Sequence, residues 1–276
     1  MIAVGCVSAK TTPLTATLLC NLGPTRLKIL QFLLSHGADP NGPRDSRTAV
    51  MVASHNHDVE ALVILLAAGG DVNLRNLNCR KKAALHYCVD NFFNFSEAQR
   101  IAYEQTAFLL DQAGADVNQA SDDGTPLSRS VEFRVYRMVK YLLFANCAIE
   151  VEPLYDHTRT PLRIAIDKGD SCSVDLLLAA GCRVDKVCLI KARRVDPTGR
   201  MVDKLSQHRL RSLRDQCVIA VKQRLRQFGH SGVFRFAAAV NSLPIPEIIK
   251  GLLMPLEMQL YLDSLGCEQD ESWNTS

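Results

Sequence analysis

Apolar residues recur at steps of three and four along much of the chain, in short blocks that end with two leucines and a turn residue. In one such block Leu62, Leu65 and Leu66 share one face of a helix. The residue after each block is one that tolerates the left-handed conformation at a helix end. These residues are Gly37, Gly69, Gly114, Asn146 and Gly181.

A second phrase precedes each block. It reads Thr-Pro-Leu at 12–14, 125–127 and 160–162, Thr-Ala-Val at 48–50 and Ala-Ala-Leu-His at 83–86. The Thr oxygen can cap a helix, and Pro suits the first helical position because its missing N–H costs nothing there. The Thr-Pro-Leu-like phrase and the block ending in two leucines recur together, in this order, five times. The chain is therefore expected to be all-α, with about five helix–turn–helix repeats that stack into a solenoid.

The composition further limits the kind of protein and its cellular compartment. Ten Cys in 276 residues include no C-x-x-C pair, which favours a reducing compartment. The net charge of +3 gives no global attraction to nucleic acid or membranes, and the longest apolar run, 61–68, is too short to span a bilayer. We expect an intracellular, cytoplasmic protein, with the nucleus as the alternative location, that needs no cofactor.

The repeated phrases resemble the ankyrin repeat over residues 11–186. The resemblance implies a protein-binding surface made of finger loops and inner helices. The third repeat carries about ten extra residues between its helices, and Phe92, Phe93 and Phe95 lie in this insertion. They could form a substrate-contact loop, or fold back over the convex side of the stack.

The composition changes after residue 186. Between 191 and 228 there are 11 basic and three acidic residues, a local charge of +8, and apolar residues recur at helical steps from 210 to 228. We expect a repeat array at 1–186, a linker at 187–208, a small helical domain at 209–262 and a disordered tail at 263–276.

The helical domain resembles a SOCS box. The elongin-binding segment of that family is matched by Ser212, Leu213, Cys217, Ala220 and Val221. The segment that selects a cullin is matched by Leu243, Pro244, Ile245, Pro246 and Leu252, although Gly251 stands where the family often has Tyr.

The whole chain thus resembles the ankyrin repeat and SOCS box family. The resemblance implies a non-catalytic substrate receptor whose partners are elongin B, elongin C, a type-five cullin with its RING subunit, and a target protein. Two alternatives stay open: a plain ankyrin scaffold whose C-terminal helices cap the stack, and a basic segment that binds nucleic acid or an anionic membrane.

We find no catalytic pattern in the sequence. No phosphate-binding glycine loop or nucleophile elbow occurs, and His55 and His57 lack further ligands at metal spacing. His86 belongs to the repeat phrase, where the imidazole is expected to fasten a loop by hydrogen bonds. We therefore predict neither an enzyme nor a metal site, and no binding of nucleic acid or membranes.

Overall fold

Most of the repeat region is described in the computed structural model of the chain. The described residues are 11–20, 23, 25–42, 46–90, 97–150, 160–207, 218, 220–222, 224–225, 233–242 and 250. Among them the fold is all-helical: two isolated antiparallel bridges occur, and no β-strand. This agrees with the all-α prediction.

The helices come in six successive pairs among these residues, each an inner helix followed by an outer one. The pairs are α1 (Pro13–Leu19) with α2 (Thr25–Ser35), α3 (Ala49–Asn56) with α4 (Val59–Ala67), α5 (Ala84–Asp90) with α6 (Glu97–Gln112), α7 (Pro126–Glu132) with α8 (Tyr136–Phe144), α9 (Pro161–Asp167) with α10 (Ser171–Ala179), and α11 (Lys186–Val195) with α12 (Arg200–Gln207).

The helix starts follow the predicted capping chemistry. The Thr48 hydroxyl accepts from the Met51 N–H at 3.2 Å, and Thr12, Thr125 and Thr160 cap their helices in the same way. Each hydroxyl satisfies a backbone donor that has no partner inside its helix. The Thr phrases therefore set where α1, α3, α7 and α9 begin.

The helix ends also follow the prediction. Gly37, Gly69, Gly114 and Gly181 have φ between 83° and 97°, and Asn146 has φ 53°. At these positive φ angles the backbone of a residue with a Cβ is strained, and Asn tolerates this conformation better than most other residues.

Side-chain bridges join each repeat to the next at the base of the finger loops, and we call them the finger-base ladder. The Asn73 amide donates to the Gly114 carbonyl at 3.0 Å and accepts from the Asp116 N–H at 2.8 Å. Asn41 makes the same pair of bonds one repeat earlier, to Gly69 and Asp71. The ladder continues with Asn118 accepting from the Ala148 N–H and Glu150 accepting from the Arg183 N–H.

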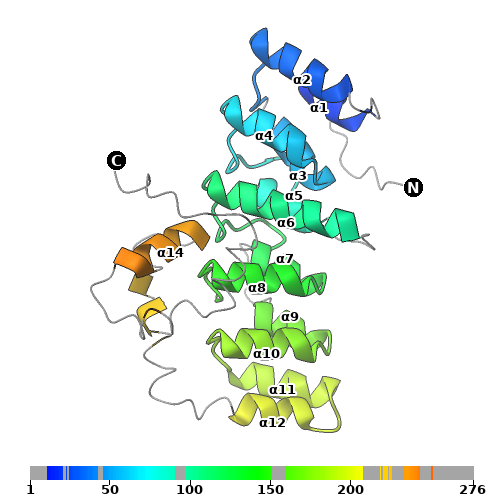
Figure 1. The fold of residues 1–276 in the computed structure, drawn as a ribbon. Helices are drawn as coiled ribbons and strands as arrows, with labels where there is room; N and C mark the ends of the chain where they lie inside the picture. Colours follow the sequence, from blue (N-terminus) through cyan, green and yellow to red (C-terminus); the bar gives the residue numbers. More distant parts are fainter. Residues whose placement is uncertain are drawn as a thin grey trace.

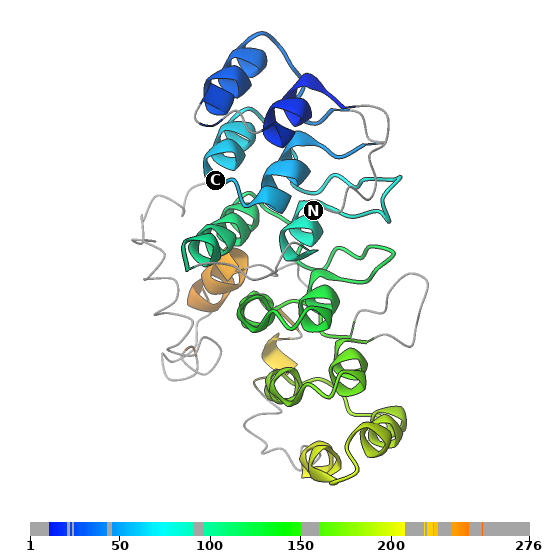
Figure 2. The ribbon, with the colours of Figure 1, turned by 90° about the vertical axis from the view of Figure 1, so that its right-hand side faces the viewer.

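The pairs stack into one elongated array with two helical layers (Figure 1). In Figure 2 the helices of α7 to α12 are seen nearly end-on, and the loops between repeats project from the side of the inner layer. One continuous apolar core runs through the array, with residues such as Leu30, Leu62, Leu110, Leu142 and Leu177 fully buried. Stacking of neighbours is what buries it, because one pair cannot cover its own apolar face.

The outer layer is uneven. The pairs α2 with α4, α4 with α6 and α8 with α10 pack closely on one another, whereas α6 and α8 share few contacts. A further helix, α14 (Val233–Ser242), contacts both α6 and α8. Figure 1 shows α14 beside these two helices, along the side of the array and away from α11 and α12 at its end.

The segment at 187–208, which the sequence suggests is a linker, contains most of two helices, α11 and α12. These helices pack on each other, and α11 packs on α9. The Asp185 carboxylate caps α11 by accepting from the Cys188 N–H at 2.8 Å and also pairs with Arg163 of α9. The described array therefore extends one helix pair beyond the predicted boundary at residue 186.

Candidate interaction surfaces

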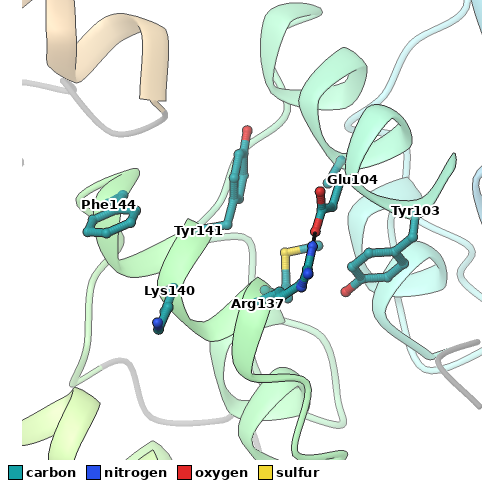
Figure 3. A pocket seen from close by; sticks show the side chains of 8 residues that line it. Tyr103, Glu104, Arg137, Lys140, Tyr141 and Phe144 are labelled. Carbon is teal, nitrogen blue, oxygen red and sulfur yellow. Dashed lines mark hydrogen bonds and ion pairs between the residues drawn. The ribbon is translucent and has the colours of Figure 1, made fainter. Parts of the chain in front are cut away.

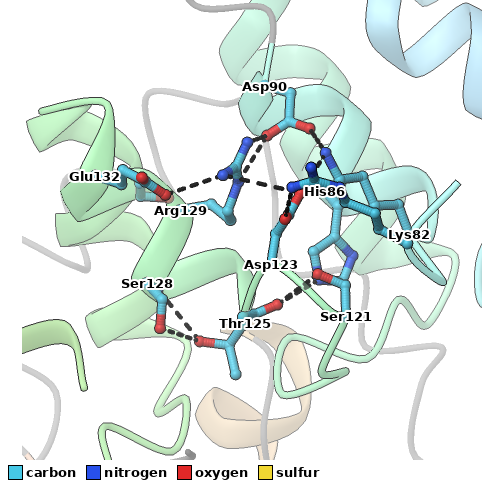
Figure 4. A network of polar contacts seen from close by, with 12 residues as sticks. Lys82, His86, Asp90, Ser121, Asp123, Thr125, Ser128, Arg129 and Glu132 are labelled. Carbon is cyan, nitrogen blue, oxygen red and sulfur yellow. Dashed lines mark hydrogen bonds and ion pairs between the residues drawn. The ribbon is translucent and has the colours of Figure 1, made fainter. Parts of the chain in front are cut away.

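A balanced cluster of charges fastens the third finger to the inner helices α5 and α7 (Figure 4). Lys82 lies 2.6 Å from the Asp90 carboxylate and 2.9 Å from that of Asp123. Arg129 of α7 reaches Asp90 at 2.7 Å and Glu132 at 2.9 Å. All of these side chains are largely buried, so each charge has a nearby partner of opposite sign.

The cluster governs the ionisation of the finger carboxylate. Burial raises the pKa of Asp123, but hydrogen bonds from Lys82 and Arg80 outweigh it, so the pKa lies below its usual value. The carboxylate therefore stays charged and keeps the finger against α5. The arrangement fixes the shape of the inner surface at this finger.

His86 fastens the same finger from inside. Its Nδ1 accepts from the Ala83 N–H, and its Nε2 lies 3.2 Å from the Gly124 carbonyl, to which it donates. This closes the start of α5, where Ala83 has no side-chain cap, and ties it to the next finger. Complete burial lowers the pKa of His86 to about 4, so the ring is neutral near pH 7. The predicted loop-fastening role of His86 is confirmed.

The outer layer carries a second surface, which we call the α6–α8 groove. It holds a cavity of about 250 Å³ between these two helices. Figure 3 shows aromatic side chains on two of its walls and an Arg137–Glu104 ion pair across it. The lining residues are Tyr103, Glu104, Ala107, Arg137, Met138, Lys140, Tyr141 and Phe144.

The groove combines a rigid floor with a basic rim. Tyr103, Ala107, Met138 and Tyr141 are buried, and the Tyr141 hydroxyl donates to the Asp111 carboxylate at 3.0 Å. Lys140 is exposed at the edge. A shape of this kind suits one apolar or aromatic side chain flanked by acidic groups.

Part of the predicted elongin-binding helix is described, and its two faces differ. Residues 218, 220–222 and 224–225 are helical. Val218 and Leu225 pack on the core of the array, and the Asn146 amide donates to the Lys222 carbonyl at 3.0 Å. Ala220 is exposed on the other side, and Val221 is exposed at the edge between the two faces.

The remaining predicted contact residues lie outside the described residues. They are Ser212, Leu213 and Cys217 of the elongin segment, Leu243, Pro244, Ile245, Pro246 and Leu252 of the cullin segment, and Phe92, Phe93 and Phe95 of the insertion. Their roles stay predictions.

The two histidines at 55 and 57 pack on aromatic rings. The ring centroids of His55 and Tyr87 are 6.3 Å apart, and those of His57 and Tyr103 are 5.1 Å apart, both in edge-on arrangements. Tyr87 belongs to α5 and Tyr103 to α6, so the two imidazoles contact different helices. Within the described part of the chain, no group of three or more His, Cys, Asp or Glu side chains is placed to hold a metal. None of the described helices is both long and apolar enough to cross a membrane.

Comparison with known proteins identifies the repeats in part of the chain. Residues 17–101 match the family model for ankyrin repeats in three copies. The chain carries ankyrin repeats. It is 28% identical over 166 residues to the ankyrin repeat protein FPV031 of fowlpox virus (strain NVSL). That match covers 58% of this chain and 46% of the viral protein, so the chain spans about half the length of this relative.

The ankyrin assignment explains the geometry of both layers. Capped inner helices, left-handed turn residues and stacked outer helices continue through α12, well beyond residue 101 where the family match ends. Such repeats are typically protein-interaction scaffolds without enzymatic activity. The finger loops, the inner helices and the α6–α8 groove are the surfaces that this scaffold offers.

The sequence reasoning missed the groove and the finger-base ladder. The ladder could have been predicted from the Asp-x-Asn triplets at 39–41, 71–73 and 116–118, each of which precedes a new repeat. Asp71 accepts from the Asn73 N–H at 2.8 Å, which turns the Asn amide toward the next repeat. The groove has no such signal, because it arises from the spacing between two helices.

Proposed function

We propose that the chain is the target-recognition subunit of an elongin B/C–cullin ubiquitin ligase. In this proposal the ankyrin array binds the target protein, and the C-terminal segment docks on elongin C and on a type-five cullin. The transfer of ubiquitin is carried out by the RING subunit and its partners, so this chain supplies binding and placement only.

The observation that supports the proposal is the division of the box helix into two faces. Val218 and Leu225 pack on the array, Ala220 faces away from it, and Val221 lies at the edge between the two faces with 37% of its surface exposed. We expect the helix to extend back to residue 213, which would place residues 213 and 217 on the side of Ala220, at steps of four and three. A helix that is held by one face and exposes the other is suited to entering the groove of a second protein.

The residue types fit that groove. Leu213 is long enough to fill an apolar pocket, and Cys217 is small enough to allow close approach one turn further on. Burial of the leucine side chain contributes about 1.5–3 kcal/mol. A charge in its place would have to be buried without a partner.

Co-expression with elongin B and elongin C tests the proposal. The full chain should co-purify as a stoichiometric complex, and Leu213→Asp or Val221→Asp should abolish it while the circular-dichroism melting curve of the array is unchanged. Val187→Asp is the matched control: Val187 on α11 is 42% exposed and Val221 is 37% exposed. Co-purification of Leu213→Asp with the elongins would refute the receptor function.

The second candidate is a plain ankyrin scaffold. It is favoured by the contacts of α14 with α6 and α8, which give the C-terminal helices a structural role on the array. In that case neither the parent chain nor any variant would bind the elongins.

A further inference from the structure

The α6–α8 groove is the place where the outer layer of the array is left open. Elsewhere in the described array, neighbouring outer helices from α2 to α10 pack on each other, whereas α6 and α8 share few packing contacts and α14 touches both. The direct links between α6 and α8 include the Arg137–Glu104 ion pair and the Tyr141–Asp111 hydrogen bond. The cavity lies between the two helices, next to α14, and is lined by Tyr103, Met138 and Tyr141 (Figure 3).

We propose that residues 267–273 of this same chain dock in the α6–α8 groove. Trp273 fills the cavity, and the acidic residues before it lie against the basic rim. This docking does not depend on elongin binding, so it can hold or fail separately from the ligase proposal.

The cavity has the chemistry that an indole needs. Its walls are aromatic and aliphatic, and an aromatic side chain gains most of its binding energy from burial against such surfaces. The indole N–H also needs an acceptor, and the Glu104 carboxylate lies in the wall of the cavity. Trp273 is the single tryptophan of the chain.

The charges are complementary. Lys140 is exposed on the rim, and Arg137, which pairs with Glu104, keeps 56% of its side chain accessible. After Lys250 the sequence has no further Lys or Arg, and Glu268, Asp270 and Glu271 directly precede the tryptophan. The segment therefore approaches a basic rim with a net charge of −3.

The connection is short enough to favour docking within one molecule. Helix α14 ends at Ser242 and contacts both α6 and α8, so the following chain starts beside the groove. The 31 residues from there to Trp273 can extend up to about 100 Å, far more than the groove requires. A tether of this kind raises the effective concentration of the segment to the order of mM.

Tryptophan fluorescence of the full chain reports on the docking directly, because Trp273 is the only source of the signal. The parent should emit at shorter wavelength, and be quenched several-fold less by acrylamide, than the urea-unfolded chain. Lys140→Glu should lower the ratio of docked to undocked segment by roughly five- to tenfold, since an attraction becomes a repulsion at the rim. Added salt should shift the parent in the same direction.

Two further variants make the result decisive. Lys28→Glu changes an exposed lysine of α2, far along the outer layer, and should leave the emission unchanged. Glu271→Lys combined with Lys140→Glu should recover part of the protection. If Trp273 is as accessible in the folded as in the unfolded chain, the docking is wrong. It is equally wrong if Trp273 is protected but responds neither to Lys140→Glu nor to salt.

Discussion

Asn146 has two roles, and the substitution Asn146→Gly separates them. It occupies the left-handed turn after α8, where the other repeats have glycine, and its amide donates to the Lys222 carbonyl of the C-terminal helix. Glycine adopts φ 53° without strain, so the variant keeps the turn. It removes the buried side chain and, with it, the hydrogen bond to the Lys222 carbonyl.

The size of the effect follows from the contact. A neutral hydrogen bond contributes about 0.5–1.5 kcal/mol, which corresponds to a roughly two- to tenfold change in an equilibrium. Relief of strain at the turn offsets this loss for the array, because non-glycine residues are disfavoured there. We therefore expect little change in the melting temperature and a two- to tenfold increase in the local opening of residues 218–225.

Hydrogen–deuterium exchange on the full chain is the appropriate assay. Amides of 218–225 should exchange faster in Asn146→Gly, while those of α7 and α9 keep their protection. Gly114→Asn is the control, since it places asparagine at the equivalent turn, where a Cβ would have nothing within 4 Å. This control should cost stability at the turn and leave 218–225 unaffected. Unchanged exchange at 218–225 in Asn146→Gly would refute the view that this bond holds the helix.

Three other predictions concern pH, the cullin segment and nucleic acid. The folded chain lowers the pKa of His86 to about 4 from the ordinary 6.5, so the unfolded chain binds more protons between these values. Stability should fall by up to about 3 kcal/mol as pH drops from 6.5 to 4, and urea titrations of the parent and His86→Gln should show a flatter dependence in the variant. Changing Pro244 and Pro246 together to Ala should spare the elongin complex and weaken cullin binding in calorimetry on the preassembled complex; equal affinities would assign the prolines a packing role only. Lys191 and Lys204 are paired with Asp167 and Asp175, so gel-shift titrations with duplex DNA at physiological salt should show weak or no binding, and a sub-micromolar complex would contradict this.

The repeat register was predictable because each of its signals acts locally. Thr48 caps α3 through a residue three positions away, and Gly69 ends its block because of its own backbone angle. Such features depend on a few neighbouring residues, so the sequence alone predicts them. The same reasoning correctly predicted that His86 would fasten a loop, since the phrase around it is part of the repeat.

Features that depend on distant segments were not predictable. Helices α11 and α12 lack the Thr-Pro-Leu and Leu-Leu phrases, and their stability comes from packing on α9 and from the Asp185–Arg163 pair. A basic segment without those phrases resembles a linker in sequence. The α6–α8 groove is still less visible, because Tyr103 and Tyr141 lie far apart in sequence and share a cavity only through the spacing of two helices.

The finger-base ladder has a mechanical consequence. Asn41, Asn73 and Asn118 fix the distance between successive repeats by directed hydrogen bonds along one edge of the array. The outer edge is held mainly by side-chain packing, which has no preferred direction, and between α6 and α8 this packing is sparse and supplemented by the Arg137–Glu104 and Tyr141–Asp111 contacts. When the array bends, the spacing between repeats therefore stays constant at the finger bases and changes between the outer helices. A partner that alters the curvature of the inner face would thus also widen or close the α6–α8 groove.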